Sequence, residues 1–100
     1  MTPVIFRRFD GEVIAVFPAT SWDRAGNMTC YAHVGQHGAC SLEWYRDTVP
    51  ASLEESMELR AELVQQGYND LVNLRDVMKT RDELGISREA YRCIVVDCHY

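Results

Sequence analysis

Apolar side chains alternate with short polar breaks along the first half of the chain, as in consecutive β-strands. Residues 4–9 and 12–17 are rich in β-branched and aromatic side chains. Asp10 and Gly11 lie between these two runs, and this dipeptide is a strong signal for a tight hairpin turn. We expect Pro18 to end the second strand, because proline cannot donate a hydrogen bond to a sheet.

The next part of the chain predicts a second pair of strands. Residues 19–27 contain Ser, Asp, Gly and Asn and are typical of a loop. We expect a third strand at residues 28–34, a turn at residues 35–38 and a fourth strand at residues 40–46, because apolar and polar residues alternate on both sides of a glycine-flanked break.

The clearest element is a helix at residues 52–66. Ser52 and Glu55 form a capping-box pattern, and Gly67 supplies a residue that can adopt the left-handed conformation at the helix end. Helical spacing predicts that five apolar residues cover one core-facing side: Leu53, Met57, Leu59, Leu63 and Val64.

The last third of the chain is less clear in its pattern. Residues 70–80 fit either a strand or a helix, whereas Thr80 and Ser87 each begin a sequence typical of a helix start. Residues 93–98 are a short β-branched run, predicted to be a strand that pairs back into the sheet. The order predicts an α+β fold, with a small antiparallel sheet of about 4–6 strands and its helices, the main one and one or two short ones, packed on one face.

Length and composition place the chain among ordinary globular domains. Its 100 residues suit one domain spanning 1–100, with 47% hydrophobic and 25% charged residues. The net charge of -5 and the lack of clustered basic residues argue against direct nucleic-acid binding. The sequence has no apolar run long enough for a membrane span and no basic–apolar leader at its start, so we expect no membrane association and a cytoplasmic location.

Four residues around the predicted turn could bind a metal ion. Cys30, His33, His37 and Cys40 are spaced Cys-x-x-His-x-x-x-His-x-x-Cys, and all four are residue types found in structural zinc sites. Strand geometry argues against this reading, because Cys30 and His33 would point to opposite faces of one strand. We therefore expect no metal and no other cofactor, and zinc stays an alternative.

The predicted sheet would also have one open face that could bind a partner. Tyr31 and His33 alternate on one strand with residues of the core-facing row, and Glu43 and Tyr45 would match them on the next strand. The expected binding residues on this face, in the turn and in the preceding loop are Trp22, Tyr31, His33, Gln36, His37, Glu43 and Tyr45. Since no nucleophile stands in a recognised motif with the histidines, we expect binding and no enzymatic activity.

Several segments resemble a known group of proteins. They are residues 4–7, 10–18, the stretch Tyr31-Ala32-His33-Val34-Gly35-Gln36-His37-Gly38, and the helix end at 62–68. Over roughly the first 75 residues the chain resembles a family of short uncharacterised bacterial proteins from phage, plasmid and other mobile elements. The resemblance implies no activity, only a biology in which small acidic proteins act by binding, including as inhibitors of host defence.

The sequence as a whole predicts a small binding or regulatory protein with a protein partner. Two alternatives remain at this point: a metal-binding protein or enzyme that uses His33 and His37, and a homodimeric interaction domain. The sequence does not identify the partner or the biological process.

Overall fold

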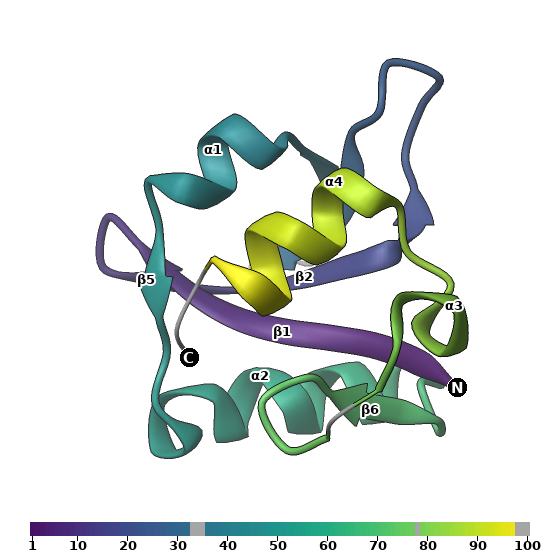
Figure 1. Cartoon of the computed structure of the whole chain (residues 1–100). Helices are drawn as coiled ribbons and strands as arrows, with labels where there is room; N and C mark the ends of the chain where they lie inside the picture. The colour runs from purple at the N-terminus through teal and green to yellow at the C-terminus, as the bar shows by residue number, and fades with distance from the viewer. Residues whose placement is uncertain (33–35, 78, 98–100) are drawn as a thin grey trace.

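The computed structural model describes residues 1–32, 36–77 and 79–97, and it has the predicted α+β fold. A six-stranded, mostly antiparallel sheet is combined with one 13-residue helix and several short ones (Figure 1). In chain order the elements are β1 (Thr2–Phe9), β2 (Glu12–Ser21), β3 (Met28–Ala32), β4 (Gln36–Cys40), α1 (Leu42–Arg46), β5 (Val49–Pro50), α2 (Leu53–Gln65), β6 (Leu71–Asn73), α3 (Arg81–Leu84), α4 (Arg88–Tyr91) and η1 (Arg92–Val96).

The sheet is built around β1. One edge of β1 pairs with β2, and the other edge pairs with two short strands, β5 and β6. The antiparallel order is β4-β3-β2-β1-β5, and β6 pairs in parallel with the start of β1. The predicted hairpin between β1 and β2 is confirmed, with Asp10 and Gly11 both at positive φ (51° and 81°), as a type I′ turn requires. This hairpin fixes the register of the two most buried strands.

Helices cover both faces of the sheet, so the prediction that they pack on one face is wrong. Figure 1 shows α1 and α4 on one side of β1 and β2, and α2 on the other. Successive β1 side chains alternate between two cores, because strand side chains alternate with period two. The α4-side core contains Ile5, Ile14, Val16, Met28, Cys40, Tyr45, Leu74, Leu84, Ile86, Ala90, Cys93 and Ile94. The α2-side core contains Val4, Phe6, Ala15, Phe17, Tyr31, Ala51, Leu59 and Leu63.

Pro18 does not end the second strand as predicted. Strand β2 continues to Ser21, and its register with β3 shifts between Phe17 and Ser21, leaving residues 18–20 without a paired β3 residue. Because the strand bulges away from the ladder at this point, the missing N–H of Pro18 costs no sheet hydrogen bond.

The predicted turn at 35–38 and the strand at 40–46 are also corrected. Gln36, His37 and Gly38 lie within strand β4, and residues 33–35 fall outside the described residues. Residues 42–46 form helix α1, and the Ser41 hydroxyl accepts the Trp44 backbone N–H and caps its first turn. Leu42 and Trp44 then pack against the α4-side core as residues of a helix.

The capping patterns in the second half are confirmed. Ser52 and Glu55 form both hydrogen bonds of the capping box at the start of α2, and Gly67 has a φ of 111° just beyond its end. Thr80 and Glu83 form a capping box at the start of α3, and the Ser87 hydroxyl caps α4 by accepting the Ala90 N–H. In the described ranges no helix is both long and apolar enough to cross a bilayer.

The structure also decides the two remaining segments. Residues 71–73 form strand β6, so the first part of the ambiguous stretch is extended. The predicted C-terminal strand is wrong: residues 92–96 continue α4 as a π-helical turn, and Cys98 lies outside the described residues. Burial of Cys93 and Ile94 against the sheet outweighs the β-propensity of the Ile-Val-Val run.

Candidate binding surface

Tyr31 and Tyr45 do not form the open sheet face that the sequence predicts. Tyr31 is buried in the α2-side core and Tyr45 is buried in the α4-side core, so the two side chains lie on opposite faces of the sheet. Glu43 is exposed on helix α1. Trp22 is 49% exposed in the loop between β2 and β3. Gln36 is exposed on β4, and His33 falls outside the described residues.

His37 belongs to an aromatic cluster on the α2 side. Its Nε2 is hydrogen-bonded to the Tyr68 hydroxyl at 2.8 Å, and its ring lies 4.9 Å from the Tyr31 ring and 6.4 Å from the Phe17 ring, between centroids. The Gln66 amide donates to the Tyr31 hydroxyl, and burial raises the pKa of that phenol above its usual value. This cluster joins strand β4 to the end of α2, which is a structural use of His37.

The described residues of the alternative zinc site, Cys30, His37 and Cys40, do not all gather in one place, and His33 lies outside the described residues. Cys30 and Cys40 lie on the α4 side of the β3–β4 pair, whereas His37 points to the α2 side and bonds to Tyr68. Among the residues that the structure describes, no three metal-ligating side chains gather in one place.

The outer side of α2 exposes large apolar side chains. Leu53, Met57 and Val64 are 60%, 62% and 51% exposed, although the sequence pattern placed all three in the core. Only Leu59 and Leu63 of the five predicted core residues are buried, together with Ser56. The helix therefore packs on the sheet through one side and presents a second apolar side to solvent.

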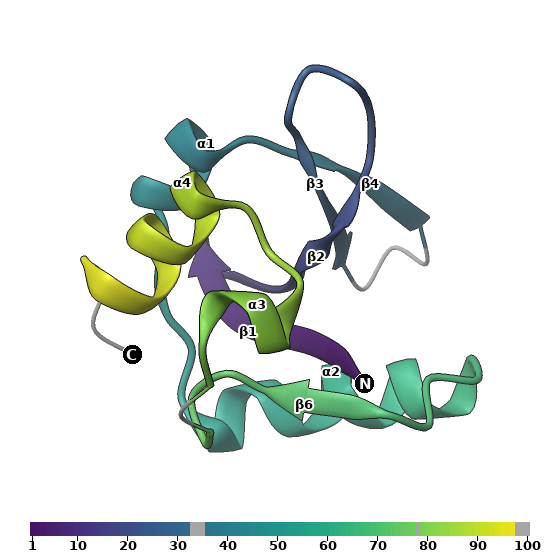
Figure 2. The ribbon, with the colours of Figure 1, turned by 45° about the vertical axis from the view of Figure 1, so that its right-hand side comes forward.

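A groove runs beside this apolar side, between α2 and β6. It encloses about 300 Å³ and is lined by apolar residues from both elements, with Arg60 and Asp76 among its polar residues. The apolar lining consists of Leu53, Met57, Leu71, Val72 and Val77. Figure 2 shows β6 running alongside α2 at the edge of the molecule, so the groove and the exposed helix side form one continuous surface.

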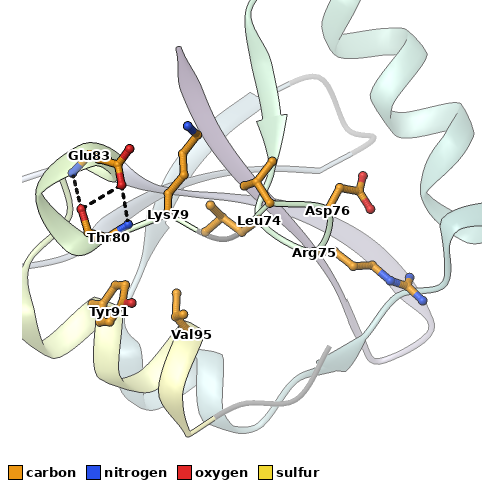
Figure 3. A pocket seen from close by; sticks show the side chains of 9 residues that line it. Leu74, Arg75, Asp76, Lys79, Thr80, Glu83, Tyr91 and Val95 are labelled. Carbon is orange, nitrogen blue, oxygen red and sulfur yellow. Dashed lines mark hydrogen bonds between the residues drawn. The ribbon is translucent and has the colours of Figure 1, made fainter.

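A second hollow adjoins this groove at Asp76 and Val77. It has a volume of about 550 Å³ and lies between the segment after β6 and the C-terminal helical turns. Figure 3 shows Leu74 on one side of it and Tyr91 and Val95 on the other. Its lining carboxylate Glu83 is already engaged with Thr80 in the capping box of α3, and Arg75 donates to the carbonyl of Ala51. Glu83 and Arg75 therefore serve the fold, and the hollow extends the groove.

Acidic residues border the apolar side of α2. The helix carries four glutamates and one arginine. At 3.6 residues per turn, Glu54 lies about 60° around the helix from Met57 on one side, and Arg60 lies about 60° from it on the groove side. Glu58 lies about 100° from Met57, beyond Glu54. Neither carboxylate forms an ion pair with any residue that the structure describes. We name the set of Leu53, Met57, Val64, Glu54 and Glu58, with the adjoining groove, the α2 surface.

The sequence contains evidence for this surface, but the evidence is missed when all apolar residues of the helix are assigned to one core-facing side. At 3.6 residues per turn, Leu53, Met57 and Val64 are centred roughly 120° around the helix from Leu59 and Leu63, so the five residues span an arc of about 160°. An arc that wide exceeds what one packed face needs, and it indicates two apolar sides on the same helix.

Comparison with known proteins adds no relative: no protein-family model, no curated protein and no solved structure matches the chain.

Proposed function

We propose that this chain is a small regulatory protein that acts by binding another protein through the α2 surface. The supporting observation is that three large apolar residues on one side of α2 are each more than half exposed, beside a groove lined by further apolar residues. Exposed apolar residues gathered next to a groove are typical of interaction sites, whereas single exposed ones are not.

The chemistry of the surface favours an amphipathic helix as the partner's contact element. A groove flanked by apolar side chains at helical spacing suits a second helix that inserts its own apolar residues. Glu54 would then face the edge of that helix on the side away from Arg60, so we infer that this edge carries lysine or arginine. The net charge of -5 acts in the same direction by steering a basic partner toward the protein.

Burial of the three apolar side chains alone would not give tight binding, so the groove and the charges must also contribute to the binding free energy. Full burial of one Leu, Met or Val side chain contributes roughly 1.5–3 kcal/mol, so burying the exposed parts of three contributes about 3–4 kcal/mol. Association costs on the order of 4–15 kcal/mol in lost translational and rotational freedom. A partner that contacts only the three side chains would bind very weakly. A partner that also fills the groove would bind with higher affinity.

A second copy of this chain would bind to the α2 surface less favourably than a basic helix. Two α2 surfaces facing each other would bring together helices that each carry four glutamates and one arginine. Like charges across an interface oppose association, so the homodimer becomes an outcome of the test below.

The resemblance to mobile-element proteins suggests what such binding would achieve. We extend the proposal to inhibition: the chain would occupy a basic helical segment of a host defence protein and keep it from its own partner. This extension depends on the binding proposal and fails with it.

The test compares two peptides and two variants of the protein. The peptides form amphipathic helices of leucine and lysine, or of leucine and glutamate, and binding is measured by fluorescence anisotropy. We expect the lysine peptide to bind at least about tenfold more tightly than the glutamate peptide. The Leu53→Asp/Met57→Asp variant should lose at least about tenfold in affinity, and the matched Trp22→Ala variant should lose none.

Folding and self-association are controlled in the same experiment. Both substituted α2 residues are more than half exposed, so circular dichroism and the thermal midpoint should stay close to those of the natural protein. Equal affinity for both peptides, or loss of binding only in Trp22→Ala, would contradict the proposal. A dimer in sedimentation that disappears in Leu53→Asp/Met57→Asp would replace the partner helix by a second copy.

A further inference from the structure

Cys30 and Cys40 meet across the β3–β4 pair, away from the α2 surface. In the strand register Cys30 lies opposite Gly38 and Cys40 lies opposite Met28, so the two cysteines are diagonal neighbours on the same side of the sheet. Each of the two thiols changes the pKa of the other. Both side chains belong to or pack against the α4-side core.

The pair opens onto a hollow of about 470 Å³. The hollow is lined by the two cysteines together with Asn27, Ala39, Ser41 and Trp44. Cys30 is partly exposed, whereas Cys40 is buried. A small solute can therefore reach Cys30 first, with Cys40 directly behind it.

The two thiols differ in their protonation. The neighbouring Cys40 thiol and the Gly38 backbone N–H lower the pKa of Cys30 to about 7. The neighbouring Cys30 thiol, with burial, raises the pKa of Cys40 above its usual value. At neutral pH Cys30 is about half in the thiolate form and Cys40 holds its proton, which is the arrangement of a nucleophile beside a resolving thiol.

We propose that Cys30 and Cys40 form a peroxide-reactive pair, in which Cys30 is oxidised first and Cys40 then closes a reversible disulfide. The Cys30 thiolate attacks one oxygen of hydrogen peroxide, the O–O bond breaks, and the departing hydroxide takes a proton to become water. Cys30 is then a sulfenic acid. The sulfur of Cys40 attacks the Cys30 sulfur, the S–O bond breaks, and the hydroxyl leaves as a second water with the Cys40 proton. Two cysteines lose two electrons, and one peroxide is reduced to two waters.

The strand geometry allows the bond after a small shift. Diagonal neighbours in a sheet lie roughly 7–8 Å apart at Cα, and disulfides favour about 4.4–6.8 Å, so β4 must move toward β3. Strand β4 is at the edge of the sheet and can move without breaking a second ladder. Gly38, opposite Cys30, has no side chain to obstruct the approach.

The test measures alkylation and oxidation of the folded protein. We expect the rate of Cys30 carboxamidomethylation to rise with pH and reach half its maximum near pH 7. At that pH Cys30 should react at least about ten times faster than the buried Cys93. Hydrogen peroxide should remove two hydrogen atoms and yield a Cys30–Cys40 linked peptide in mass spectrometry, and dithiothreitol should reverse both changes.

Two single variants separate the roles of the cysteines. Cys40→Ser should stop at the sulfenic acid, which dimedone traps on Cys30, and Cys30→Ser should prevent peroxide reaction at Cys40. A linkage that involves Cys93 or Cys98 in place of this pair, or a Cys30 that reacts no faster than Cys93, would overturn the proposal.

Discussion

Replacement of Arg7 by alanine should lower the free energy of unfolding by about 3 kcal/mol, whereas Arg8→Ala should lower it by less than about 1 kcal/mol. The two arginines are neighbours in β1 and differ in their surroundings. Arg7 is only 3% exposed, and Arg8 is exposed and forms a surface ion pair with Glu55 at 3.0 Å. The comparison isolates what burial adds to the same side chain.

Arg7 joins the sheet to the end of helix α1. Its Nε donates to the Thr48 hydroxyl at 2.7 Å, its second guanidinium nitrogen donates to the Thr48 carbonyl at 2.9 Å, and its plane lies over the Tyr45 ring at 4.3 Å. Each hydrogen bond from a charged group contributes roughly 1.5–3 kcal/mol, and the contact with the ring up to about 2 kcal/mol. The cost of burying the charge offsets part of this sum, which leaves the net value near 3 kcal/mol.

Urea unfolding of the three proteins measures this difference. The thermal midpoint of Arg7→Ala should fall in parallel. Equal loss in the two variants would show that Arg7 is as solvated as Arg8, and would contradict the buried position in the fold.

Ile94→Ala should also lower the free energy of unfolding by about 3 kcal/mol, because the side chain is fully buried in the α4-side core. The matched change Val96→Ala should alter it by less than about 0.5 kcal/mol, since Val96 is 59% exposed and alanine favours helix. The two positions are two residues apart in η1. The expected difference in the free energy of unfolding follows from the helical turn, which places the two side chains on different sides.

This pair of variants tests the C-terminal structure directly. In a strand, residues 94 and 96 would share one face and respond alike, because side chains alternate with period two. Denaturant unfolding that gives similar losses for Ile94→Ala and Val96→Ala would contradict the π-helical turn and favour the strand that the sequence pattern predicts.

Elements specified by local chemistry were predictable from the sequence. The Asp10-Gly11 turn needs positive φ at both residues, and a hydroxyl at Ser52, Thr80 or Ser87 binds N–H groups three residues on. Such signals depend only on nearby residues, so the hairpin, α2 and the starts of α3 and α4 were found. The fold class followed from their order.

Elements decided by tertiary packing were not predictable in the same way. The segments at 42–46 and 92–96 have alternating or β-branched residues, yet contact with the α4-side core makes both helical. The sheet is covered on both faces because Val4 and Phe6 pack against α2 while Ile5 packs against the other helices. Local alternation along one strand cannot show that both sides find partners.

The candidate site was the least predictable feature. Tyr31 and Tyr45 looked like exposed residues because their parity matched polar neighbours, and both are core residues. Leu53, Met57 and Val64 looked like core residues because they fit helical spacing, and all three are exposed. Which apolar side of α2 contacts the sheet depends on how the helix docks. The spacing of apolar residues along α2 is compatible with docking through either side.

The most direct test of the α2 surface is an amide NMR titration of the isotope-labelled protein with the leucine–lysine helical peptide. We predict that the largest chemical-shift changes fall on residues 53–64 and 71–77, which form the exposed helix side and the groove. Changes centred instead on the Trp22 loop or on strand β4, or no change at peptide excess, would contradict a docking site on α2.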